Sequence, residues 1–180
     1  MKNFRLFLLA IAIPFISFAQ VKKVSLQAAG LTCSMCSNAI NKSFKTLTYI
    51  DKVTTNLETN TFEITFKDPS KVDFDQLKAK VEGAGFSVAK MMVTLDVNNL
   101  KIANDAHVKI GNETFHFLNV KDQTLNGDET FTLVDKGFVL DKQFKKYAAF
   151  TKMSCVQTGH MASCCAKDVT AGTRIYHVTI

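Results

Sequence analysis

The chain has 180 residues, with 22 Lys and Arg, 16 Asp and Glu, and 47% hydrophobic residues. This composition is typical of a folded chain and excludes wholesale disorder. The positive charge is dispersed, without a basic stripe interleaved with aromatic side chains, which argues against nucleic acid as a partner.

The first 19 residues have the features of a secretory signal peptide. A basic start over residues 1–5 precedes an apolar run over residues 6–18, and residues 17–19 supply small side chains at the two positions that a signal peptidase reads. Cleavage before Gln20 removes two of the 22 basic residues, which leaves a formal charge of +4, and sends the protein to the periplasm or the medium. An uncleaved membrane anchor is the alternative, but the run is shorter than the ~20 residues of a spanning helix and contains Pro14. No later segment is apolar enough to span a membrane.

Residues 20–92 alternate between strand and helix patterns. Apolar residues recur with a period of two in the strands and with helical spacing between them. The expected elements are a strand at 24–28, a helix over 36–47, a hairpin of strands at 53–57 and 62–66, a helix over 74–84 and a strand from 86. The order βαββαβ predicts a split sandwich, in which both helices lie on one face of a four-stranded antiparallel sheet.

Two thiols, Cys33 and Cys36, lie between the first strand and the first helix. The unpaired backbone N–H groups and the positive end of a helix favour thiolates at such a place. The pair is therefore the candidate site for a soft metal ion.

The unit 20–92 resembles the heavy-metal-associated domain found in copper chaperones and metal-pumping ATPases. The order of elements, the loop Gly30-Leu31-Thr32-Cys33-Ser34-Met35-Cys36 and the segment Gly83-Ala84-Gly85-Phe86 carry this resemblance. It implies a ferredoxin-like fold in which Cys33 and Cys36 are the metal-binding thiolates. It also implies that Thr32 precedes the first thiolate, that Leu31 anchors the loop where most of the family has Met, and that Phe86 covers the metal.

Two thiolates without a carboxylate or imidazole suit Cu(I), and also Hg(II) or Ag(I), better than an ion that needs four ligands, as Zn(II) does. Family members that favour zinc often have Asp before the first Cys, where this chain has Thr32. We expect a Cu(I) chaperone or scavenger that exchanges thiolate ligands with a metal-donor or metal-acceptor protein, such as a membrane transporter or another metalloprotein, and that is not an enzyme.

Two alternatives stay open. The first is a thiol-disulfide oxidoreductase that uses Cys33 and Cys36, although the thioredoxin pattern places a cis-Pro opposite the thiols, and this chain has only Pro14 and Pro69. The second is a secreted β-rich interaction protein whose thiol pair is oxidised.

Residues 93–180 show short alternating runs separated by turn signals and predict a small all-β unit, a sandwich or a barrel. These runs lie at 93–97, 108–110, 114–120, 130–134, 138–140 and 175–180. No family resemblance is found here. His107, His116 and His177 fall on or directly beside the predicted strands and are expected to be ordinary strand residues.

The same half contains a dense group of soft ligands, formed by Cys155, His160, Cys164 and Cys165. These residues could form a second copper or zinc site. A disulfide from Cys155 to Cys164 or Cys165 is the favoured alternative, because an exported protein meets an oxidising compartment. The chain has five cysteines, so at least one thiol is left for another role.

Overall fold

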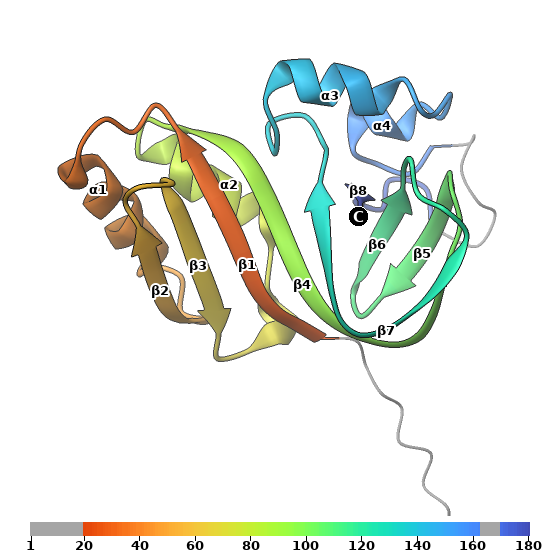
Figure 1. Ribbon diagram of the computed structural model, residues 1–180, viewed down its shortest axis with the longest axis horizontal. Helices are drawn as coiled ribbons and strands as arrows, with labels where there is room; N and C mark the ends of the chain where they lie inside the picture. Colours follow the sequence, from red (N-terminus) through yellow and green to blue (C-terminus); the bar gives the residue numbers. More distant parts are fainter. Residues whose placement is uncertain (1–19, 163–169) are drawn as a thin grey trace, which may run out of the picture.

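The computed structural model describes residues 20–162 and 170–180, and within them the chain forms one eight-stranded sheet, whose arrangement can be followed in Figure 1. The strand order is β2-β3-β1-β4-β7-β8-β6-β5. The predicted signal peptide, residues 1–19, lies outside the described residues. No helix in the described part of the chain has the length and apolar character needed to cross a membrane.

The first half has the predicted βαββαβ order. Its elements are β1 (Gln20–Ala29), α1 (Ser34–Phe44), β2 (Ile50–Asn56), β3 (Thr61–Phe66), the short 3₁₀ helix η1 (Pro69–Lys71), α2 (Phe74–Gly83) and β4 (Ser87–Ile102). Both helices lie on one side of the sheet (Figure 1), because each has an apolar stripe: α1 buries Ile40 and Phe44, and α2 buries Leu77 and Val81. The predicted ferredoxin-like unit is confirmed.

The second half is rich in strands, as predicted, and adds two helices. Its elements are β5 (Ala106–Ile110), β6 (Glu113–Phe117), β7 (Gln123–Leu133), α3 (Asp141–Ala148), α4 (Cys155–Thr158) and β8 (Ile175–Thr179). The all-β unit predicted from the sequence contained no helices, so α3 and α4 were not expected. Half of the eight residues of α3 are charged, and the helix buries only Phe144, with Tyr147 and Ala148 half-buried on the same face, so its apolar stripe is short. Residues 138–140, predicted as a strand, form only a single bridge between Lys136 and Val139.

The two halves share strand β4. This strand pairs antiparallel with β1 on one edge and with β7 on the other. The predicted boundary between residues 92 and 93 falls inside it. The pairing with β7 slips between Val97 and Leu100, and the two strands bend together on their way into the second half (Figure 1).

Side chains from α2 fill the junction between the halves. Phe74, fully buried, meets the rings of Tyr176 and Phe115 with centroid distances of 5.0 and 6.3 Å. These residues belong to one apolar core that extends from β1 to β8. The strands of the second half therefore hold a fixed position relative to the first helix pair.

Candidate metal centre

Cys33 and Cys36 lie at the start of α1. Cys33 is the N-cap residue, with an extended backbone (φ −152°, ψ 159°), and Cys36 is in the first helical turn. The backbone N–H of Cys36 donates to the Cys33 carbonyl at 3.1 Å. This turn brings the two Sγ atoms to 2.9 Å from each other.

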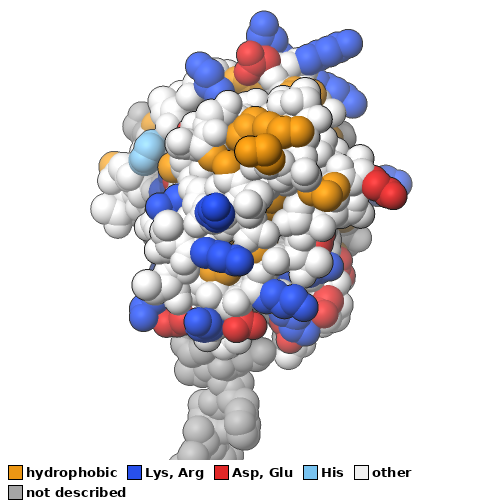
Figure 2. Space-filling view, turned by 90° about the vertical axis from the view of Figure 1, so that its left-hand side faces the viewer, with side chains coloured by type: hydrophobic (Ala, Val, Ile, Leu, Met, Phe, Trp, Pro, Cys, Tyr) orange, Lys and Arg blue, Asp and Glu red, His pale blue; other side chains and the backbone are white. Residues whose placement is uncertain are grey.

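The pair is accessible from solvent. Cys33 is exposed, Cys36 is half-buried, and Met35 between them is 80% exposed. Figure 2, which faces the side of the molecule that carries α1, shows one larger group of hydrophobic side chains above its centre and smaller groups elsewhere, with Lys and Arg side chains on the same face. A partner protein can therefore approach the thiols directly.

The surroundings of Cys33 favour its thiolate form. A hydrogen bond from the Cys36 thiol, and then the backbone N–H groups of Cys36 and Met35, hold the pKa of Cys33 below its usual range. Because the thiolate is the form that ligates metals and attacks electrophiles, the loop is prepared for either chemistry.

The dithiol must open to hold an ion in a linear arrangement. With a metal–sulfur bond of about 2.3 Å, as for Zn–S, the two sulfurs would lie about 4.6 Å apart, against the 2.9 Å observed. The exposed side chain of Cys33 can supply this movement. Among the described residues no His, Asp, Glu or third Cys gathers with the pair, so of these ligand types only the two Cys sulfurs are brought together.

The residues predicted to support the loop, Leu31, Thr32 and Phe86, differ in their burial. Leu31 and Phe86 are half-buried and pack against the main core, whereas Thr32 is exposed. Gly30 has a left-handed backbone (φ +84°), and a Cβ there would lie 3.8 Å from the Phe86 ring. Phe86 thus lies against the start of the loop, and its role as a cover for the metal stays a prediction.

The second predicted group is arranged differently from the expectation. Cys155 is fully buried, whereas His160 is exposed and its Nδ1 donates to the Thr158 carbonyl at 2.9 Å. Cys164 and Cys165 lie outside the described residues, so their pairing with Cys155, as ligands or as a disulfide, stays a prediction.

Three histidines that were expected from the sequence to be ordinary strand residues, His107, His116 and His177, surround Cys155. Its Sγ lies 3.4 Å from His177 Nε2, 3.7 Å from His116 Nδ1 and 3.8 Å from His107 Nε2. His116 and His177 are fully buried. Burial, with the neighbouring imidazoles of His107 and His177, lowers the pKa of His116 to about 4, and burial also lowers the pKa of His107. The His116 ring is therefore neutral at pH 7.

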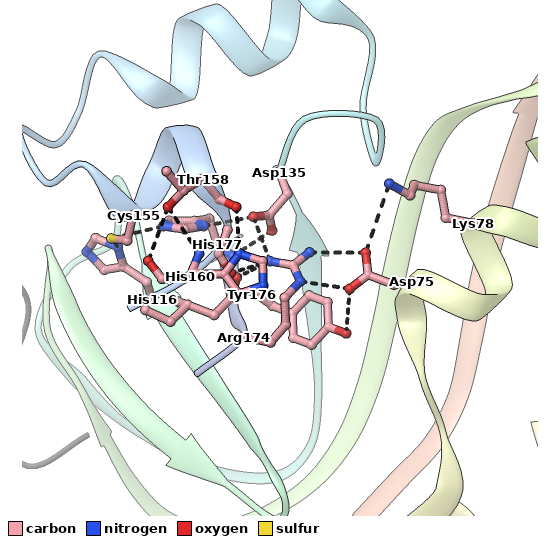
Figure 3. Close-up of polar contacts among 12 residues, drawn as sticks. Asp75, Lys78, His116, Asp135, Cys155, Thr158, His160, Arg174, Tyr176 and His177 are labelled. Carbon is pink, nitrogen blue, oxygen red and sulfur yellow. Dashed lines mark hydrogen bonds and ion pairs between the residues drawn. The ribbon is translucent and has the colours of Figure 1, made fainter. Parts of the chain in front are cut away.

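A chain of polar contacts leads from this group to α2 (Figure 3). His177 Nδ1 lies 2.8 Å from Asp135 Oδ1, and Arg174 Nη1 donates to the same oxygen at 3.4 Å. Arg174 Nε also donates to Asp75 on α2 at 2.7 Å. The buried histidines are thus connected to a helix that packs behind the first half of the sheet.

Comparisons with known proteins concern the first half of the chain. Residues 25–87 match the family model of the heavy-metal-associated domain, and no family model matches the C-terminal half. A copper-exporting P-type ATPase of Bacillus subtilis is 25% identical over 85 residues, which are 47% of this chain and 10% of the relative. A probable copper-exporting P-type ATPase of Archaeoglobus fulgidus is 31% identical over 78 residues, 42% of this chain and 10% of the relative. The matches thus span about a tenth of the length of these curated relatives.

Solved structures also match part of the chain. The yeast copper transporter domain CCC2A, described in apo and Cu(I)-loaded states, is 34% identical, with 36% of this chain and 88% of that chain covered and a TM-score of 0.33. The CopZ metallochaperone is 25% identical, with 37% and 98% covered and a TM-score of 0.35.

Proposed function

We propose that this chain, whose residues 25–87 form a heavy-metal-associated domain, carries Cu(I) on Cys33 and Cys36 outside the cytoplasm and passes it to another protein. The observation that carries the proposal is the exposed pair of sulfurs at the head of α1. A donor set of two sulfurs suits a soft ion of low coordination number. The names of both curated relatives, which refer to copper export, support the choice of metal.

The transfer is an exchange of ligands without a change in oxidation state. A thiolate or thioether of the partner attacks the under-coordinated ion from the solvent side. Cys33, the more exposed thiolate, then leaves first, and Cys36 follows. The partner is a metal donor or acceptor, either a membrane transporter or another metalloprotein. Export is supported by the basic start, apolar run and small residues of positions 1–19.

A titration with Cu(I) tests the proposal. The reduced whole chain is titrated against a competing Cu(I) chelator, alongside the Cys33→Ser/Cys36→Ser variant. A Met35→Leu variant is the matched control, because Met35 lies between the thiols and its thioether is a potential ligand. We expect the double variant to lose the tightest equivalent of Cu(I) and the control to keep it. Unchanged tight binding in the double variant would disprove the site.

A thiol-disulfide oxidoreductase is the second candidate, because the 2.9 Å contact between the sulfurs and the lowered pKa of Cys33 also suit disulfide exchange. The two candidates differ in their need for metal. Reduction of a disulfide substrate by the metal-free chain, abolished in Cys33→Ser, would favour the oxidoreductase. A metal-free chain that does not turn over while it still binds Cu(I) would favour the carrier.

A further inference from the structure

Three histidines meet in the second half because of strand register. His107 on β5 is directly opposite His116 on β6, and His116 is directly beside His177 on the parallel strand β8. The rings of His107 and His116 stack with centroids 4.2 Å apart, and those of His116 and His177 meet at 5.0 Å. Helix α4 places Cys155 against this row, as Figure 3 shows for His116 and His177.

The distances from the sulfur to the imidazole nitrogens fit a metal site. With bonds of about 2.3 Å to sulfur and about 2.05 Å to nitrogen, a tetrahedral ion sets sulfur and nitrogen about 3.6 Å apart. The three observed distances are 3.4, 3.7 and 3.8 Å. The ligand atoms of His107, His116 and Cys155 all lie within 4.8 Å of one another.

Carboxylates fix two of the rings in the orientation that a metal requires. Asp105 Oδ1 lies 2.9 Å from His116 Nε2, and Asp135 Oδ1 lies 2.8 Å from His177 Nδ1. Each carboxylate accepts a hydrogen bond from the ring nitrogen that faces it, and the other ring nitrogen of His116 and of His177 is directed at Cys155 Sγ. Metal-binding histidines are held by carboxylates in the same manner.

A thiol alone does not account for this arrangement. Ring nitrogens of both His116 and His177 face Cys155 Sγ, and a thiol has only one proton to donate. Cys155, His177 and Asp135 also have the order of a nucleophile, a base and an orienting acid. However, Cys155 is 0% exposed and two further imidazoles face the same sulfur, which a single proton transfer does not need.

We propose that His107 Nε2, His116 Nδ1 and Cys155 Sγ bind a transition-metal ion of the copper and zinc class, and that His177 Nε2, which lies 3.4 Å from the same sulfur but outside the group gathered within 4.8 Å, moves in as the fourth ligand. Imidazole and thiolate together select such ions over Mg²⁺ or Ca²⁺, which prefer oxygen. This site is separate from Cys33 and Cys36 and differs in ligand set from the group predicted from the sequence, because His160 is exposed and turned to Thr158.

Co(II) is the probe, since a thiolate ligand gives it a charge-transfer band and a tetrahedral site gives it intense visible bands. The whole chain with Cys33→Ser and Cys36→Ser is reduced and titrated with Co(II) without oxygen. We expect one equivalent with both bands, and displacement of the cobalt by Zn(II) or by Cu(I) added separately. The Cys33→Ser/Cys36→Ser chain lacks the thiols of the first site. If it binds no Co(II), the second site is rejected, whereas the proposed carrier function is not affected.

Further substitutions in this background assign the ligands. Cys155→Ser removes the charge-transfer band, and His116→Gln changes the visible bands and weakens binding. Asp135→Asn weakens Co(II) binding about 10- to 100-fold with the stoichiometry kept. His160→Gln is the matched control and leaves the spectrum unchanged, as does Cys164→Ser/Cys165→Ser.

The proposal is overturned if the background chain binds no Co(II), or if the charge-transfer band survives Cys155→Ser or disappears with the Cys164→Ser/Cys165→Ser pair. Displacement by neither Zn(II) nor Cu(I) would also overturn it. Thermal unfolding of each metal-free variant shows whether it folds. A ligand variant that fails to fold is replaced by Asp135→Asn, whose unchanged affinity would then reject the site.

Discussion

Arg174 connects the two halves of the chain, and its replacement by Met should lower the stability of the whole protein. The guanidinium donates to Asp75 on α2 through Nε at 2.7 Å and Nη2 at 3.3 Å, and to Asp135 at 3.4 Å. It also lies over the Tyr176 ring, 4.2 Å from the centroid. Methionine keeps much of the apolar contact but donates no hydrogen bond, so the variant isolates the polar contribution.

The burial of the partners sets the magnitude. The side chains of Arg174, Asp75 and Asp135 are 23%, 39% and 5% exposed. Breaking a fully buried ion pair costs about 3–5 kcal/mol and an exposed pair contributes about 0–1 kcal/mol. Because the replacement leaves the buried carboxylate of Asp135 without its cation, we expect a loss of about 3 kcal/mol for Arg174→Met. For Asp75→Asn, whose partner stays paired with Asp135, we expect about 1 kcal/mol.

Thermal unfolding at pH 7 measures these losses. A loss of about 3 kcal/mol lowers the midpoint of a protein of this size by roughly 6–12 °C. The Arg174→Met/Asp75→Asn double variant should lose less than the sum of the single losses, because both remove the same pair. Lys22→Gln, which removes a surface ion pair with Asp128 and Asp96, is the control and should leave the midpoint nearly unchanged. Additive single losses, or an Arg174→Met midpoint equal to the control, would refute the reasoning.

The same pair makes a prediction about pH. Burial raises the pKa of Asp75, but the Arg174 guanidinium, with help from the Tyr176 hydroxyl, outweighs this effect and the pKa lies below its usual range. A depressed carboxyl pKa stabilises the fold above the unfolded value of about 3.9, and this stabilisation is lost as the pH falls through the folded value. The difference in stability between the wild type and Asp75→Asn should therefore shrink below pH 4. A difference that stays constant to pH 2 would contradict the assignment.

Three further predictions concern the loop and the junction. Cys36→Ala should slow the alkylation of Cys33 at pH 7, because it removes the hydrogen bond that lowers the pKa of Cys33. Mass spectrometry measures the rate. An unchanged rate would show that the backbone N–H groups are sufficient to lower this pKa. Gly30→Ala forces a side chain into a left-handed conformation and should cost about 1 kcal/mol and weaken Cu(I) binding, and equal affinity would show that the loop tolerates the strain. Phe74→Ala should lower the free energy of unfolding by about 3–5 kcal/mol, whereas Phe150→Ala should lower it little, because Phe150 is 41% exposed. Equal losses would refute the role of Phe74 in packing the junction between the halves.

The first half could be predicted because its signals are local. Apolar periodicity marks each strand and helix, and Asp73 caps α2 by accepting from the Gln76 backbone N–H, as its position suggests. The thiols of Cys33 and Cys36 are three residues apart, so a single helical turn brings them together. A site built from adjacent residues needs no knowledge of strand pairing.

The histidine site depends on pairing across long stretches of chain. The contact between His107 and His116 could have been predicted from the sequence, because a tight turn at Gly111-Asn112 sets these two residues opposite each other in the hairpin. The position of His177 could not have been predicted, since β8 runs parallel to β6 and its register follows from the whole sheet. Cys155 lies on a single helical turn, 39 residues from His116, and no local pattern indicates that the two side chains meet.

The two thiol sites differ in the properties that govern how fast a metal leaves. Cys33 is exposed and its donor set is two sulfurs, so an incoming ligand can reach the ion and replace one bond at a time. Cys155 is 0% exposed, and Asp105 and Asp135 hold two of the rings that face it, so every exchange there requires the core to open. An ion at the first site is therefore suited to transfer, whereas an ion in the proposed second site is retained and stabilises the second half of the fold.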